Sequence, residues 1–179
     1  MTPYVVGIDL SLTATGVAVW DVALPGTVPL LLLETVVPAP RLDGLRRLRS
    51  VRSEVTARVR GADLVVLEGL YPQRQANAYS NERAGLWWLV VDRLDALAVP
   101  YAVVQPSAVK VYATGKGGGK GLTKVSVAVA AAKRYDVSPQ DDNQADACIL
   151  SCMGLHHLGC PPAPVPATHE RALKAVVWP

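Results

Sequence analysis

Three acidic residues stand where the chain could bring them together around a bound cation. Asp9 and Glu68 each end an apolar run typical of a buried strand, YVVGID at 4–9 and DLVVLE at 63–68. A carboxylate in such a place is costly unless it binds a cation or finds hydrogen-bond donors. Asp146 adds a third acid on an expected helix. Hard oxygen ligands from three elements suit Mg²⁺ or Mn²⁺, and two such ions support in-line displacement at phosphorus.

The residues near Asp146 allow more than one interpretation. Asp142 and Asn143 lie within one helical turn of it and share its face. Asp141 could cap the same helix, with Gln144 completing a capping box. The two acids at strand ends could likewise cap a turn or pair with an arginine. Any one of these acids alone is more often structural, but three together favour a metal site.

The apolar patterns predict the elements that must position these acids. Strands are expected at 4–10, 15–20, 28–36, 63–68 and 101–105, and helices at 42–59, 77–97, 107–112, 122–135 and 142–157. The first three strands are closely spaced and therefore antiparallel, whereas the later strands alternate with helices. This order predicts an α/β fold with a mixed sheet flanked by helices. We expect one domain over 1–158 and an irregular, Pro-rich tail over 159–179.

Basic segments surround the acidic focus. Residues 41–60 contain seven arginines against two acids, and residues 110–134 contain five lysines and one arginine with no acid. Basic flanks around acids suit a metal-dependent enzyme that acts on a polyanion. The arginines of 41–60 could equally form a solvated helix face.

The composition narrows the class of protein. The 179 residues are 50% hydrophobic and 18% charged, which excludes a disordered chain and fits a single domain. No apolar stretch approaches the roughly 20 residues that span a bilayer, and the N-terminus has no basic region typical of a signal peptide. Three cysteines without framework spacing indicate a reducing compartment, so we expect a cytoplasmic protein from a bacterial cell or a phage-infected host.

Two motifs are misleading. The glycine-rich stretch GKGGGKG at 115–121 lacks the Ser or Thr that follows the lysine of a nucleotide-binding phosphate loop. Cys148, Cys152, His156 and Cys160 recur every four residues and would span about 18 Å of helix, which is too long for one zinc ion. We expect a buried helix stripe there.

Four segments, taken in order, resemble the RuvC-type Holliday-junction resolvases of the RNase H-like superfamily. They are GIDLSLTATGVAV (7–19), DLVVLEGLY (63–71), PYAVVQPSAVK (100–110) and NQADACIL (143–150). The resemblance implies that Asp9, Glu68 and Asp146 are metal ligands and catalytic residues. It places Asn143 where the family has Asp or His, with Asp142 directly before it. Asn143 matches the register and Asp142 supplies the charge, so the fourth position stays open between them.

The resemblance also implies how the chain contacts DNA and a second copy of itself. Lys110 and Lys124 match basic residues that assist catalysis near the scissile phosphate, and Lys116 and Lys120 would add phosphate contacts. Tyr71 matches an aromatic residue that stacks on unpaired bases. The expected helix at 77–97 matches the dimer helix of the family. Of its adjacent tryptophans, Trp87 and Trp88, one would face the core and the other a partner copy.

The function implied is that of a homodimeric, structure-selective DNA endonuclease of recombination and repair, with two Mg²⁺ (or Mn²⁺) ions per site. One ion, held by Asp9 and Asp146, would activate water, and the other, held by Asp9 and Glu68, would stabilise the leaving 3′ oxygen. Paired symmetric nicks in a four-way junction would leave 5′-phosphates. Two alternatives remain: a broader nuclease of forks and flaps, or a junction-binding protein weakened by Asn143.

Overall fold

The computed structural model describes residues 3–21, 30–70, 79–117 and 124–179. Its strands are β1 (Val5–Asp9), β2 (Thr15–Asp21), β3 (Leu30–Val36), β4 (Leu64–Glu68) and β5 (Tyr101–Val104). Its helices are α1 (Gly44–Val59), α2 (Ser80–Ala96), α3 (Pro106–Thr114), α4 (Lys124–Tyr135), α5 (Asp142–His157), α6 (Ala167–Glu170) and the short 3₁₀ helix η1 (Leu173–Ala175). The parts of the expected elements at 28–29, 77–78 and 122–123 lie outside the described residues. In the described ranges no helix combines the length and the apolar character needed to cross a membrane.

The strands form one mixed sheet in the order β3-β2-β1-β4-β5. β1 pairs antiparallel with β2, and β2 with β3, whereas β1–β4 and β4–β5 are parallel. The predicted α/β class with a mixed sheet is therefore confirmed. In the β1–β4 ladder Ile8 lies opposite Leu67. The next residues of the two strands, Asp9 and Glu68, consequently reach the same edge of the sheet.

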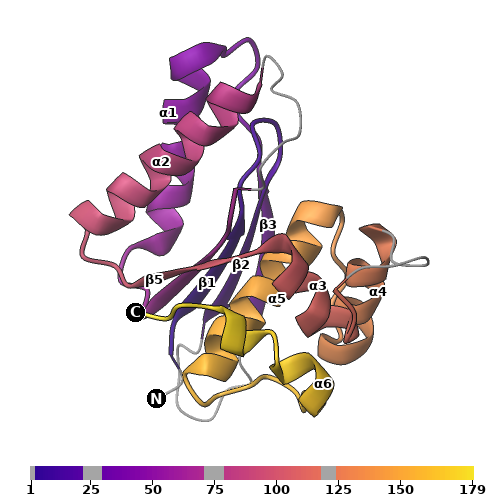
Figure 1. The fold of residues 1–179 in the computed structure, drawn as a ribbon. Coiled ribbons are helices and arrows are strands. Elements are labelled where there is room, and N and C mark those ends of the chain that lie inside the picture. Colours follow the sequence, from indigo (N-terminus) through magenta and orange to yellow (C-terminus); the bar gives the residue numbers. More distant parts are fainter. Residues whose placement is uncertain (1–2, 22–29, 71–78, 118–123) are drawn as a thin grey trace.

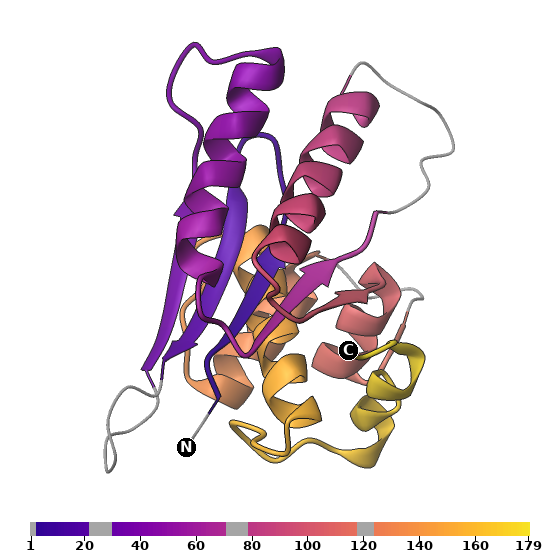
Figure 2. The ribbon, with the colours of Figure 1, turned by 90° about the vertical axis from the view of Figure 1, so that its left-hand side faces the viewer.

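Helices cover both faces of the sheet (Figure 1). Alternate residues of a strand point to opposite faces, and in β1 Val6 and Ile8 join the core under α1 and α2, while Val5 joins the core around α5. Figure 2 shows α1 and α2 together on their face of the sheet, and the two helices pack on each other. On the opposite face α5 lies against β1 and β2. The expected buried stripe of α5 is confirmed for Cys148 and Cys152.

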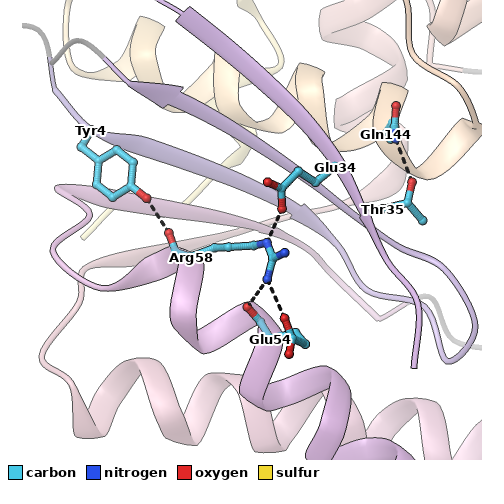
Figure 3. A network of polar contacts seen from close by, with 6 residues as sticks. All are labelled: Tyr4, Glu34, Thr35, Glu54, Arg58 and Gln144. Carbon is cyan, nitrogen blue, oxygen red and sulfur yellow. Dashed lines mark hydrogen bonds and ion pairs between the residues drawn. The ribbon is translucent and has the colours of Figure 1, made fainter. Parts of the chain in front are cut away.

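Polar contacts join helices from both layers to β3 (Figure 3). Arg58 of α1 forms ion pairs with Glu34 of β3 and with Glu54 one turn earlier on its own helix. On the other face, Gln144 of α5 donates to the Thr35 hydroxyl over 2.8 Å. These contacts set how α1 and the start of α5 lie on the sheet.

The C-terminal residues differ from the irregular segment that the sequence predicts. They form α6 and η1, and Ala172 and Val176 are buried in the core around α5. Trp178 stacks on His157 with ring centroids 4.2 Å apart. Helices of three or four residues carry no amphipathic period, so only the prolines were visible in the sequence pattern.

Candidate active site

The ends of β1 and β4 bring two carboxyl groups into contact. Asp9 is only 6% exposed, and its side chain is hydrogen-bonded to that of Glu68. The backbone at Glu68 is held in place because its carbonyl oxygen accepts a 3.0 Å hydrogen bond from the Trp87 indole of α2. The parallel register therefore builds the pair, and α2 fixes the end of the strand that carries Glu68.

Two glycines let α5 approach the sheet closely enough to add Asp146 to this pair. A Cβ atom on Gly7 of β1 would lie 2.1 Å from the backbone oxygen of Ala147, and one on Gly16 of β2 would lie 2.0 Å from that of Asn143. No side chain fits in either place. The helix backbone consequently rests directly on β1 and β2, and the negative charge of Asp146 acts on Asp9.

The first turn of α5 is held by its own hydrogen bonds. Asp141 caps the helix, accepting from the Gln144 backbone N–H over 2.7 Å. The Gln144 side chain accepts from the backbone of Gln140, so the reciprocal half of a capping box is shifted by one residue. The Asn143 amide nitrogen donates to the carbonyl oxygen of Ala14, and Asn143 also lines the cavity described next.

These side chains open into a cavity of about 550 Å³ at the edge of the sheet. Asp9, Glu68, Asp142, Asn143 and Asp146 all line it. The cavity thus gathers every predicted metal-site residue and keeps both candidates for the fourth position. Residues 10–13, in the loop between β1 and β2, form another part of its wall.

Basic side chains from three helices line the same cavity. They are Arg47 of α1, Arg83 of α2 and Lys110 of α3. Arg47 forms an ion pair with Glu82, the residue just before Arg83. Within the described residues Arg83 forms no ion pair, although its charge acts on both Asp9 and Glu68. The site is therefore an acidic centre with a cationic rim.

The electrostatics of the carboxyl pair follow from its burial. Burial, together with the negative charges of Glu68 and Asp146, raises the pKa of Asp9 to about 8. Burial also raises the pKa of Glu68, while its hydrogen bond with Asp9 and the nearby positive charges oppose that rise. Burial and the neighbouring acids therefore favour the protonated form of Asp9 as long as no positive charge enters the site.

The donor set fits a divalent cation. Adjacent carboxylates cannot all ionise in a buried place without a positive charge between them, and Mg²⁺ prefers oxygen ligands. The described residues contain no group of three or more His, Cys, Asp or Glu side chains already arranged around one ion position. A carboxyl group must be deprotonated to bind a metal ion, so Asp9 and Glu68 would bind it as carboxylates.

The predicted DNA contacts divide into three groups. Lys110 lines the cavity, whereas Lys116 is exposed and lies outside the lining. Tyr71 and Lys120 fall outside the described residues. Lys124 begins α4, and its side chain is not among those described.

Sequence reasoning missed Arg83 and Tyr79, which line the cavity from the start of α2. The available signal was their place in the chain. The helix that follows a strand ending in a catalytic acid begins near that same edge of the sheet.

The adjacent tryptophans of α2 point in different directions, as the helical geometry predicts. Trp87 packs against the core under α1 and α2, and Trp88 is 62% exposed. Their rings meet edge to face with centroids 5.0 Å apart. One ring therefore supports the active-site edge while the other faces outward.

The fold has clear counterparts among solved structures. The structure of Thermus thermophilus RuvC is similar to this one, with a TM-score of 0.67 and 23% sequence identity. The match covers 91% of this chain and 99% of the RuvC chain. The chain has the RuvC fold. RuvC from the same organism, in complex with a Holliday-junction substrate, matches 92% of the chain at TM-score 0.67 and 19% identity. The fowlpox virus resolvase, also bound to Holliday-junction DNA, matches 87% at TM-score 0.57 and 15% identity. No protein-family model and no curated protein sequence matches the chain.

Proposed function

We propose that this chain is a divalent-metal-dependent endonuclease that resolves four-way DNA junctions by paired symmetric nicks leaving 5′-phosphates. One observation carries the proposal: on a RuvC fold, three carboxylates from β1, β4 and α5 line one cavity whose rim is cationic. The two solved resolvases bound to Holliday-junction DNA share that fold. Branched DNA is therefore the substrate that the fold and the charge pattern support best.

Each part of the site has a role in this proposal. Asp9, Glu68 and Asp146, with Asn143 or Asp142, would hold two Mg²⁺ or Mn²⁺ ions, which supply an activated water and stabilise charge on the leaving 3′ oxygen. The Arg83 and Lys110 side chains would bind the non-bridging oxygens of the scissile phosphate. The Arg47–Glu82 ion pair would keep the start of α2, and hence Arg83, at the edge of the cavity.

The remaining assignments concern binding rather than chemistry. Lys116, Lys120 and Lys124 would contact phosphates beside the cut, and Tyr71 would stack on an unpaired base. Two copies would associate through α2, with Trp88 at the interface. A twofold dimer places two active sites on a junction that itself has twofold symmetry.

Nicking of a labelled four-way junction tests the proposal, beside linear duplex, fork and flap substrates, in Mg²⁺ or Mn²⁺. Symmetric nicks confined to the junction are expected, and Asp146→Asn should abolish them. Asp141→Asn is the matched control, because Asp141 caps the same helix without lining the cavity. Equal cutting of forks and flaps would indicate a broader branched-DNA nuclease. Tight junction binding without cleavage in either metal would refute the catalytic proposal.

A further inference from the structure

A second cavity, of about 360 Å³, lies between the C-terminal halves of α1 and α2. It is lined by Arg52, Ser53, Thr56 and Ala57 of α1, by Arg60 directly after that helix, and by Asp92, Arg93 and Ala96 of α2. We call it the arginine groove. Its size falls at the lower end of the range typical of ligand sites, and the two alanines leave room between the longer side chains. Its residues do not overlap with those of the active-site cavity.

Among the described residues, the cations of the arginine groove lack the acidic partners that two arginines of α1 have. Arg47 and Arg58 both form ion pairs with glutamates. Within the described part of the chain, Arg52, Arg60 and Arg93 form no ion pair and no side-chain hydrogen bond. Asp92 lines the groove but pairs with none of the three arginines. The groove therefore carries a formal charge of +2.

Three like charges that line one hollow repel one another. An anion in the groove would relieve that repulsion. Arginine presents a planar set of N–H donors that matches phosphate oxygens, and the Ser53 hydroxyl adds a further donor at the same place. The groove therefore has the chemistry of a phosphate-binding site.

The position of the groove relates it to the active site. The same two helices line both cavities, with Arg47 and Arg83 at the active site. At 1.5 Å per residue, the axial distance is about 15 Å from Arg83 to Arg93 and about 20 Å from Arg47 to Arg60. A duplex strand carries one phosphate per 3.4 Å of its axis, so these distances correspond to about four to six base pairs.

We propose that the arginine groove binds the phosphate backbone of a duplex arm, about four to six base pairs from the phosphate that is cut. This inference rests on the proposed nuclease function and adds to it a second DNA-binding surface away from the chemistry. Contacts to the backbone alone carry no base information. The groove would therefore add affinity and orientation without sequence preference.

The test compares junction binding by the wild-type chain and by the triple variant Arg52→Gln, Arg60→Gln, Arg93→Gln. Fluorescence anisotropy in EDTA measures the dissociation constant between 50 and 200 mM salt. Each lost phosphate contact lowers the salt slope of log K by about 0.9. With three contacts, wild type should lose about 40-fold more affinity than the variant over this range.

A charge-matched control separates the groove from net charge. Arg41→Gln, Arg46→Gln, Arg49→Gln removes three exposed arginines that do not line the groove, and it should change the slope less. Asp92→Asn adds no contact but removes a negative charge, so it should tighten binding. Arm length supplies a further readout: arms shorter than about four base pairs should bind wild type and groove variant equally.

Several outcomes would overturn the inference. Equal slopes for the groove and control variants would show that only net charge matters. An unchanged slope in a folded groove variant would assign the groove to another ligand, such as an acidic protein segment. Asp92 and Ala96 follow Trp88 along α2 at steps of four residues and share its face, so a changed oligomeric state of the groove variant would instead make the groove part of the proposed dimer interface. If wild type fails to nick any junction, the proposed function fails by itself, and the binding comparison still decides the role of the groove.

Discussion

Replacing Gly16 with alanine should disable the active site without touching an acidic residue. The added Cβ would lie 2.0 Å from the Asn143 backbone oxygen and 2.2 Å from its carbonyl carbon. Ordinary contact begins near 3.4 Å, so the start of α5 must move away from β2 by about 1.4 Å. Asp146 lies one turn further along α5 and would move with it.

The displacement sets the size of both expected effects. Misplacing a reacting group by about 1 Å can lower a rate by about 10²-fold, so single-turnover nicking of a four-way junction should fall by at least that factor. Overpacking costs about 1–3 kcal/mol, which corresponds to a Tm lowered by about 2–12 °C in a chain of this size. Rapid quench and thermal denaturation by circular dichroism measure the two quantities.

Two further glycines supply matched controls. A Cβ on Gly85 of α2 would lie 3.5 Å from the Leu48 side chain, in ordinary contact. Gly85→Ala should therefore stabilise α2 by about 0.5–1 kcal/mol and leave nicking unchanged. Gly154→Ala would crowd Val5 and Val66 at 2.8 Å near the far end of α5, so it should lower the Tm with much less effect on the rate. Wild-type nicking by a folded Gly16→Ala variant would refute the claim that this close approach positions Asp146.

Three other experiments test individual side chains. Burial and the charges of Glu68 and Asp146 raise the Asp9 pKa from 3.8 to about 8, so ionising Asp9 costs the folded protein on the order of 6 kcal/mol. In EDTA the wild-type free energy of unfolding should fall between pH 4 and 8, and that of Asp9→Asn should fall much less, as urea denaturation would show. Arg83→Gln should slow nicking by about 10²-fold while Arg83→Lys retains part of the rate, and equal rates for the two variants would exclude a role for the charge. The Mg²⁺ concentration that gives half-maximal nicking should rise in whichever variant, Asp142→Ala or Asn143→Ala, removes the fourth ligand. If neither variant changes that concentration, neither residue is a metal ligand.

The ends of β1 and β4 could be predicted because two signals in the sequence mark each of them. An apolar run and then an acid describe both β1 and β4, and the structure ends those strands at Asp9 and Glu68. The face of α5 was equally visible from its spacing. The C-terminal segment was not, because Ala172 and Val176 are isolated apolar residues among prolines, and their burial depends on a surface that only the finished fold provides.

Lys110 of the cationic rim was predicted from the resemblance, but Arg83 could not be predicted in the same way. Arg83 reaches the cavity from a different layer of the fold, and the angle between α2 and the sheet decides where a long side chain ends. The importance of Gly7 and Gly16 is also invisible to a pattern, since a glycine in a strand is explained only by the backbone opposite it. Acids at strand ends are local features, whereas these features depend on contacts between elements distant in sequence.

The buried acids of the active site and the arginines of α1 and α2 can be explained together, because both helices line the active-site cavity and the groove. Buried acids destabilise the chain unless something positive approaches them, and unpaired arginines destabilise it unless something negative does. Among the described residues the three groove arginines form no ion pair, and Asp9 and Glu68 lie side by side in a buried place. A metal ion would compensate the acids and a phosphate backbone the arginines, and a DNA strand bound through metal at the cut would continue toward the groove. Binding DNA and metal together should therefore raise the Tm by more than the sum of the two separate shifts, and strictly additive shifts would argue that the two surfaces act independently.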